Sequence, residues 1–244
     1  MGLLLPGLLI VLWEVVTRAG LLPAHWLPPP AVIVRTTYEL AATGELAHHV
    51  AATLGRVAGG FAIGALAATL LGLLTGRSAT LRALIDPTLQ GLRSVPSLAW
   101  VPLFLLWLGI GELSKVALIA FGAFFPIYLN LLAGIQAIDP RWIEVGRVFR
   151  YERWQLARHV LIPAALPAYL TGLRSGLGLG FMFVVAAELM GASRGLGYLM
   201  VDGQTTSRPE LIISALLLFA LVGKISDHLL ERLGARVQPH RAAV

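Results

Sequence analysis

Long apolar runs with almost no charge constrain this chain more than any other feature of its sequence. The runs near residues 53–75, 116–138 and 160–190 are each long enough to cross a bilayer as a helix, which takes about 20 residues. They lack the strict alternation of polar and apolar residues that membrane β-strands show. Only 13% of the 244 residues are charged, whereas a soluble domain has roughly a quarter. The sequence therefore predicts an all-α polytopic membrane protein.

We expect about six transmembrane helices. The first, from Leu3 to Val16, lacks the basic start and the small-residue cleavage site of a signal peptide, so we interpret it as a short span. In the third, Pro96 and Pro102 interrupt the chain before the run Leu103–Ile110. The remaining spans are expected near residues 53–75, 116–138, 160–190 and 211–232.

The segments between the spans differ in charge. We expect a basic loop at residues 77–87 and a glycine-rich polar link at residues 191–210. Eleven of the nineteen Lys and Arg residues fall on the side of the stretch between the fourth and fifth spans, five fall on the other side, and three lie within spans. Cytoplasmic loops are the more basic ones. We therefore place both termini and that central stretch in the cytoplasm.

The central stretch, Asp139–Pro167, is the most charged part of this apolar chain. Trp142, Val145 and Phe149 recur in it at helical spacing, which predicts a short amphipathic helix. Asp139 followed by Pro140 is a typical helix start, with a capping side chain and then a helix-initiating proline. Such a helix between two spans can lie on the membrane surface or dock into a groove of a soluble partner. The alternative is an ordinary basic cytoplasmic loop.

This stretch resembles the EAA loop of permease subunits in bacterial ABC importers. Glu144, Val145 and Gly146 occupy the Glu-Ala-Ala positions, and Leu161–Pro163 lies near the closing Leu-Pro. The chain departs from the pattern at Arg150, which takes the place of the glycine that turns the chain after the helix. Three further segments, GIGELSKVALIAFGAFFPIYLN, LIPAALPAYLTGLRSGL and AAELMGASRGLGYLM, are similar to the branch that imports sulfonates, taurine and nitrate. The resemblance extends from about residue 21 to residue 234.

The resemblance implies a multi-pass protein of the bacterial inner membrane with a type I ABC importer permease fold. Residues 1–244 would form a single transmembrane domain, with a cytoplasmic coupling loop at residues 139–159. It implies a homodimer that docks two ABC ATPase subunits, which would bind ATP and Mg²⁺. A periplasmic or lipid-anchored substrate-binding protein would deliver a small solute, an aliphatic sulfonate, taurine or a nitrate-like anion. The residues expected to couple to the ATPase are Trp142, Glu144, Val145, Gly146, Arg147, Phe149 and Arg150.

The sequence has no motif with which the chain could act as an enzyme. It lacks the GxxxxGK[ST] loop that cradles nucleotide phosphates, since Gly223 and Lys224 are followed by Ile225. It has no cysteine, and His48–His49 is an isolated pair that we interpret as interfacial rather than metal-binding. We therefore expect no cofactor or metal on this chain. Basic cytoplasmic loops explain the net charge of +6 better than nucleic-acid binding does.

Three ionisable side chains lie within the expected spans. A charge at mid-membrane costs about 2.5–3.5 kcal/mol on insertion scales and usually faces a protein interior or a watery path. Arg56 and Arg174 could line the pathway and meet an anionic substrate. The alternative is that they lie near span ends or form structural ion pairs. We expect Glu188 to brace the link that follows it by accepting backbone N–H bonds.

Small polar side chains are the other candidates for lining the pathway. Ser94 and Ser97 flank Pro96, and irregular backbone in a membrane is tolerated where it faces a cavity. Asn130 lies within the fourth span. The alternative for these residues is a position packed inside the protein.

Glycines in two of the expected spans have the spacing of helix-packing surfaces. The second span has three pairs four residues apart, and small residues at this spacing let helices approach closely. We predict that both spans pack through these faces. The glycines are Gly55, Gly59, Gly60, Gly64, Gly72 and Gly76 in the second span and Gly172, Gly176 and Gly180 in the fifth.

A secondary carrier driven by an ion gradient is the alternative function. Such carriers use paired ionisable residues in mid-span and an internal repeat. We find no repeat in the sequence, and Glu188 has no evident partner there. A membrane-embedded enzyme is a third class, and it would need paired aspartates or a His/Glu cluster within the spans.

Overall fold

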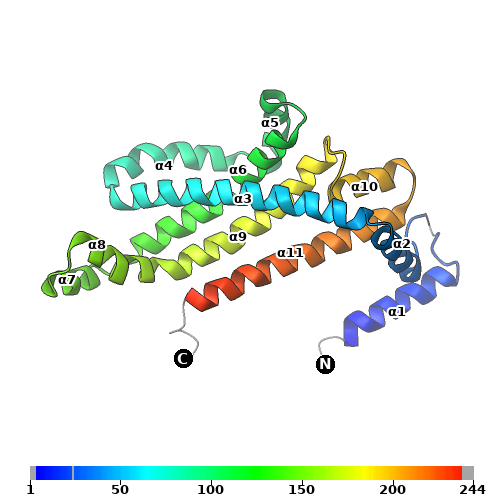
Figure 1. Ribbon diagram of the computed structural model, residues 1–244, viewed down its shortest axis with the longest axis horizontal. Helices are drawn as coiled ribbons and strands as arrows, with labels where there is room; N and C mark the ends of the chain where they lie inside the picture. The colour runs from blue at the N-terminus through cyan, green and yellow to red at the C-terminus, as the bar shows by residue number, and fades with distance from the viewer. Residues whose placement is uncertain (1–3, 24, 238–244) are drawn as a thin grey trace. The chain divides into compact units, whose positions relative to one another are not determined.

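The computed structural model describes residues 4–23 and 25–237, and the side chains of Ser97, Arg147, Arg153 and Val237 lie outside the described part. Every regular element in these residues is helical, as the sequence predicted. The long helices are α3 (Glu45–Arg77), α6 (Glu112–Gln136), α9 (Ile162–Leu189) and α11 (Pro209–Val237) (Figure 1). The shorter elements are α1 (Leu4–Arg18), α2 (Pro30–Ala42), α4 (Ala79–Ser94), the 3₁₀ turn η1 (Ser97–Trp100), α5 (Val101–Leu108), α7 (Pro140–Val148), α8 (Arg153–Leu156), the π-helical turn η2 (Ala157–Leu161) and α10 (Leu196–Thr205).

Four helices in the described residues are long and apolar enough to cross a membrane, and they match four of the predicted spans. They are α3, α6, α11 and the continuous helical segment Trp154–Leu189, which contains α9. The pair α4 and α5, bent by 87° at the predicted proline break, makes a fifth candidate if it is one span. The first predicted span is the 15-residue helix α1. At about 22 Å, α1 alone is shorter than a hydrocarbon core of about 30 Å.

Two segments that we expected to be irregular are helical. The predicted basic loop at residues 77–87 lies largely in α4, whose first turn is capped by Ser78: its hydroxyl accepts the N–H of Leu81 at 3.2 Å. Pro87 and the charges around it suggested a loop, but Asp86 accepts a hydrogen bond from Tyr128 of α6 at 2.8 Å, which holds α4 in place. The predicted polar link at residues 191–210 contains α10, because tertiary partners satisfy the first N–H groups of that helix.

The chain divides into two compact units. One comprises the residues up to Gly55 together with Val185–Gly223, and the other comprises Arg56–Val184 together with the residues from Lys224 on. Each boundary falls within a continuous helix, α3, α9 or α11.

In the unit that contains Arg56–Val184, α6 is the central helix. Ala123, Ile127 and Tyr128 of α6 are almost completely buried and form one core cluster with Ala68 of α3. Half of the apolar part of α6 is buried, a larger share than in the other three long spans. Because α6 is covered on several sides by protein, its contacts determine how α3 and α9 pack in this unit.

The glycines of α3 form a packing face as predicted, with the exception of one pair, and the helix they pack against is α6. A Cβ added to Gly60 would lie 2.5 Å from Cβ of Ile119, and one added to Gly64 would collide with the backbone of Ala120. Gly72 and Gly76 face Leu131 and Ile135 further along α6. The pair Gly55 and Gly59 was predicted to pack in the same way, but Gly55 has no atom within 4 Å of such a Cβ and Gly59 only one, at 4.0 Å.

The glycine face of α9 packs against another side of α6. A Cβ added to Gly176 would lie 2.7 Å from Cγ1 of Ile127, and one added to Gly172 would lie 2.9 Å from Cβ of Asn130. Contacts this short are absent from real side chains, so only glycine fits there. Gly180 is less tightly placed, at 3.4 Å from Ile119.

In the unit that contains the N-terminal helices, polar contacts join α1 to α2 and α2 to α11. The backbone N–H of Ala31 donates to the carboxylate of Glu14 on α1 at 3.0 Å. Thr37 of α2 donates to Ser214 of α11 at 3.0 Å, and Ser214 is buried. A hydroxyl shared between two packed apolar helices fixes their register, because in an apolar surrounding it has few other partners.

Candidate functional site

The helix α7 begins as the sequence predicted. The carboxylate of Asp139 accepts the backbone N–H of Arg141 at 2.9 Å, and the carbonyl of Asp139 accepts the N–H of Trp142 at 3.0 Å. Pro140 occupies the first helical position, where no N–H is needed. Two of the four N–H groups that a helix leaves unpaired at its start are thereby satisfied.

The turn that ends α7 is made by Arg150, at the position where the EAA loop has a glycine. Arg150 has φ +56°, in the left-handed region. The N–H of Tyr151 donates back to the carbonyl of Gly146 at 3.0 Å, which is the six-to-one bond of a Schellman cap. The chain therefore makes the glycine-type turn with an arginine.

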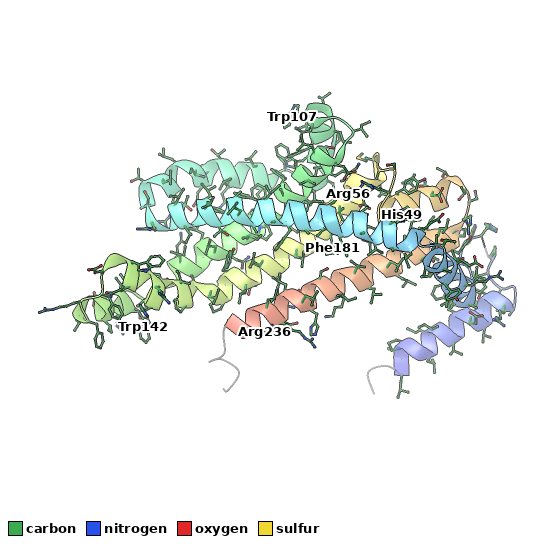
Figure 2. The ribbon with its side chains drawn as sticks, viewed as in Figure 1. His49, Arg56, Trp107, Trp142, Phe181 and Arg236 are labelled. Carbon is green, nitrogen blue, oxygen red and sulfur yellow. The ribbon has the colours of Figure 1, made fainter. Side chains whose placement is uncertain are left out.

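The two faces of α7 have different surroundings. Gly146 is buried, and a Cβ there would lie 2.5 Å from Cδ1 of Leu156 on α8, so this face packs on the segment that returns to the membrane. Trp142, Val145 and Phe149 lie on the exposed face, with exposed fractions of 64%, 46% and 70%. Figure 2 shows Trp142 pointing away from the helices that follow. The periodicity predicted this shared face correctly.

Two further apolar side chains in this segment are exposed. Val148 is 82% exposed and Trp154 of α8 is 68% exposed. Glu144, also exposed, lies on the same helix. The side chain of Arg147, which we expected to take part in coupling, lies outside the described part of the chain. We call Trp142, Val145, Val148, Phe149 and Trp154 the coupling surface.

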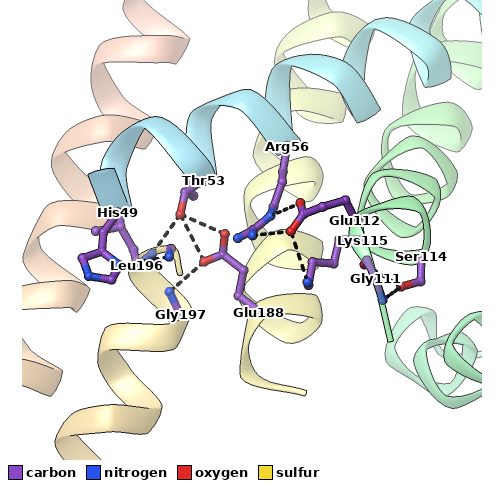
Figure 3. Close-up of polar contacts among 11 residues, drawn as sticks. His49, Thr53, Arg56, Gly111, Glu112, Ser114, Lys115, Glu188, Leu196 and Gly197 are labelled. Atoms are coloured by element: carbon purple, nitrogen blue, oxygen red, sulfur yellow. Dashed lines mark hydrogen bonds and ion pairs between the residues drawn. The ribbon is translucent and has the colours of Figure 1, made fainter. Parts of the chain in front are cut away.

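Arg56, a predicted pathway residue on α3, is buried and paired with a carboxylate. Its Nε and Nη2 donate to the two carboxylate oxygens of Glu112 on α6 at 2.6 and 2.7 Å, a bidentate geometry (Figure 3). Lys115, one turn further on, donates to the same carboxylate at 3.4 Å. Because its guanidinium is already bound by a carboxylate, Arg56 fits the structural alternative better than an anion site.

Arg174, the second predicted pathway arginine, forms a separate ion pair. Its guanidinium donates to both carboxylate oxygens of Asp227 on α11 at 2.9 Å each. Glu231, one turn on, accepts a third contact at 3.4 Å. Because two carboxylates already bind this guanidinium, Arg174 also fits a structural ion pair better than an anion site. The structure thus places Arg56 and Arg174 in two different ion-pair clusters.

The small polar candidates bond mainly to their own helices. Asn130 donates its side-chain amide to the carbonyl of Pro126 at 2.8 Å, and Ser94 donates to the carbonyl of Gln90 at 2.9 Å. Such bonds to the previous turn satisfy the side chain without a ligand. The backbone of Ser97 begins η1 directly after the break, but its side chain lies outside the described part.

Glu188 braces the start of α10, as the sequence predicted. Its carboxylate, 1% exposed, accepts the N–H of Gly197 at 2.8 Å and the hydroxyl of Thr53 at 2.9 Å. Thr53 in turn accepts the N–H of Leu196 at 2.9 Å (Figure 3). A negative charge at the N-terminus of a helix is stabilised by the helix dipole and its unpaired N–H groups. No pattern in the sequence indicated Thr53 as a partner, because a threonine in an apolar span usually packs against its neighbours.

His49 also belongs to the start of α10. Its Nδ1 accepts the N–H of Gly195 at 3.0 Å, and its ring stacks on Tyr198 at 5.7 Å between centroids. Gly195 has φ +124°, and a Cβ there would lie 2.5 Å from the Glu188 carboxylate, so this position requires glycine. No group of three metal-binding side chains occurs in the described residues.

A cavity of about 240 Å³ adjoins the break between α4 and α5. Its wall is largely aromatic: Phe121 and Phe125 of α6, Phe183 of α9 and Trp100 of η1, with the Phe121 ring 5.1 Å from both Trp100 and Phe125. Arg93 of α4 is the charged side chain in this wall. None of the described candidates from the sequence lines it. Phe121 and Phe125, one helical turn apart on α6, were the overlooked signal.

Comparisons with known proteins agree with the resemblance in the sequence. Residues 60–239 match the family model described as binding-protein-dependent transport system inner membrane component. A putative aliphatic sulfonates transport permease protein of Bacillus subtilis is 44% identical over 95% of this chain and 85% of its own length. A taurine transport system permease protein of Escherichia coli is 32% identical over 98% of this chain and 88% of its own length. A nitrate import permease protein of Synechocystis is 32% identical over 96% of this chain and 87% of its own length.

Proposed function

Because the chain belongs to the family of binding-protein-dependent transport system inner membrane components, we propose that it carries an aliphatic sulfonate or a related small anion across the membrane. The chain is a permease subunit of an ABC importer, and ATP is hydrolysed by a partner subunit. The proposed substrate class is supported by the 44% identity to a permease named for aliphatic sulfonates, which exceeds the 32% identity to those named for taurine and nitrate.

The permease works with an ATPase and a substrate-binding protein. We propose the finer arrangement of two permease copies, two ATPase subunits and a periplasmic or lipid-anchored binding protein, with residues 1–244 as one transmembrane domain. Support for a single domain comes from the unit boundaries, each of which falls within a continuous helix.

We propose that the coupling surface docks into a groove of the ATPase subunit. The observation that supports this most strongly is the pair of exposed aromatic side chains, Trp142 on α7 and Phe149 in the turn that follows it, outside the candidate spans. Exposed apolar residues gathered on one helix face mark an interaction site, and an amphipathic helix in a groove is a recurrent way to bind. Glu144, Gly146, Arg147 and Arg150 would complete the contact, with Gly146 and Arg150 fixing the shape of the helix end.

The experiment that tests this proposal is uncoupling of the assembled transporter. Glu144→Lys changes the exposed charge of α7, and Gly146→Trp displaces α7 from Leu156 of α8. Neither should unfold the spans, and each should reduce substrate uptake per ATP hydrolysed by at least tenfold, because the helix no longer fits its groove. Uptake and ATP hydrolysis would be measured together in proteoliposomes. Glu45→Lys, the same charge change at an exposed position at the start of α3, is the control. Normal coupling in both α7 variants would refute the docking assignment.

We propose a structural role for Arg56 and Arg174 and a pathway position for the chain beside Ser94 and Ser97. The support for the first is that carboxylates already bind both guanidinium groups. The support for the second is the break itself: the helix stops at Val95, so carbonyl groups of the last turn lack helical partners. In a membrane such groups are tolerated where they face a cavity.

A further inference from the structure

We propose that the cavity beside the break between α4 and α5 binds an organic anion with a short hydrocarbon chain, the chemical class of the alkanesulfonates. This inference rests on the proposed function, because it says where the permease would hold its substrate class. It adds that the cavity recognises the hydrocarbon chain of the anion as well as its charge.

The size and the lining of the cavity suit the hydrocarbon part of such an anion. Sites for drug-sized ligands measure about 300–1,000 Å³, so a cavity of about 240 Å³ suits a smaller molecule. The rings of Phe121, Phe125 and Phe183 present apolar surface from two helices. Burying each further methylene of a ligand against such a wall should strengthen binding roughly fourfold.

Arg93 supplies the positive charge. Its guanidinium donates to the neutral side-chain oxygen of Gln90 at 3.3 Å, and it forms no ion pair within the described part of the chain. Asp86, two turns earlier on α4, accepts a hydrogen bond from the hydroxyl of Tyr128 and forms no ion pair with Arg93 within the described residues. Arg93 therefore differs from Arg56 and Arg174, whose guanidinium groups are bound by carboxylates. An arginine can bind an oxyanion with two parallel hydrogen bonds.

Trp100 adds an unsatisfied donor to the same wall. Its indole nitrogen is enclosed and has no hydrogen-bond partner among the described residues. A buried donor without an acceptor is unfavourable, and a ligand oxygen that supplies the acceptor removes that penalty.

The test measures binding to the purified permease–ATPase complex in nanodiscs of phosphatidylcholine, without the binding protein. Methanesulfonate, ethanesulfonate and butanesulfonate would be titrated by calorimetry. We expect affinity to rise roughly fourfold per methylene. Arg93→Gln should lower the affinity for all three by at least tenfold. Trp100→Phe, which keeps the ring and removes the donor, should lower it about threefold.

Two matched substitutions control for general damage. Arg77→Gln removes an exposed arginine at the end of α3, and Trp107→Phe changes a tryptophan of α5 that is 63% exposed and does not line the cavity (Figure 2). Both should bind like the natural protein. If Arg93→Gln and Trp100→Phe also bind like it, the cavity is not the site. Affinity that is independent of chain length would equally overturn the proposal.

The proposed function is tested separately, by butanesulfonate uptake into proteoliposomes that contain the complete transporter. Uptake by the natural protein with unchanged binding in the Arg93→Gln variant would leave the function intact and refute the site. An absence of uptake would refute the substrate class itself. If phosphatidylglycerol in the nanodiscs displaces butanesulfonate while uptake continues unchanged, the cavity is a site for lipid headgroups, and the proposal is overturned.

Discussion

Arg150 occupies a backbone conformation that most residues avoid. A left-handed conformation costs an L-residue about 1–2 kcal/mol because Cβ approaches the following carbonyl. Arg150 adopts it at φ +56°, and the Tyr151 to Gly146 hydrogen bond completes the turn. The packing of Leu156 on Gly146 holds the returning chain at the same point. The turn therefore depends on contacts around the residue, since the residue type itself opposes it.

We predict that Arg150→Gly stabilises the end of α7 by about 1 kcal/mol, because glycine has no Cβ to strain. The amide of Tyr151 should then exchange its hydrogen about fivefold more slowly in hydrogen–deuterium exchange. Arg141→Gly replaces a residue that already has a helical backbone, so it should destabilise α7 by about 1 kcal/mol. Faster exchange at Tyr151 in Arg150→Gly would mean that the arginine side chain itself holds the turn.

At the scale of the elements, α6 is packed by glycines from two neighbouring helices. Gly60 and Gly64 of α3 approach its backbone on one side, and Gly172 and Gly176 of α9 approach it on another. Helices in a membrane gain little from the hydrophobic effect, so close contact through small residues contributes much of their association. The partner of each glycine is an ordinary aliphatic residue, which is why the glycines alone indicated these faces in the sequence.

Substitutions at these glycines should separate packed from open positions. We expect Gly60→Leu and Gly176→Leu each to destabilise the permease by about 3 kcal/mol or more, because the added side chain forces the helices apart. Gly55→Leu on α3 and Gly178→Leu on α9 are the matched controls, since an added Cβ has no atom within 4 Å at either position. Thermal unfolding in detergent measures the difference. Equal loss of stability in all four variants would contradict the packing assignment.

At the scale of the whole molecule, transport requires that some surfaces change their exposure as ATP binds and others do not. The break at Val95–Pro96 and the cavity beside it are candidates for the first kind. Leu66 and Leu217 are candidates for the second, because both are more than half exposed on apolar helices and would face lipid.

Single cysteines can test this distinction, because the chain has none of its own. Ser94→Cys and Ser97→Cys should react with a water-soluble thiol reagent, and their rates should change about tenfold when ATP is trapped in the assembled transporter. Leu66→Cys and Leu217→Cys should react slowly in both states. If the cysteines at positions 94 and 97 reacted slowly while those at positions 66 and 217 reacted fast, the pathway would lie elsewhere.

The sequence alone determined the helical class, four of the long spans, the proline break and the amphipathic helix α7 with its cap. Each of these depends on residues close together in the chain, either as a run of apolar side chains or as a periodic pattern. The family could also be identified from the sequence, because the residues of the EAA loop pattern lie close together in the chain. The glycine spacing predicted two packing faces correctly and failed for Gly55 and Gly59, because spacing does not say whether a neighbour is present.

The tertiary structure decided what the polar and aromatic residues do. Arg56 and Arg174 looked alike in the sequence as charges in apolar spans, and only the structure shows that carboxylates 56 and 53 positions away bind them. The helix α10 follows glycines and polar residues that suggest a loop, and it forms where Glu188 and Thr53 satisfy its first N–H groups. The cavity joins residues from α4, η1, α6 and α9. Contacts between residues distant in the chain leave no local pattern, so the arrangement of the helices had to be known before these sites could be identified.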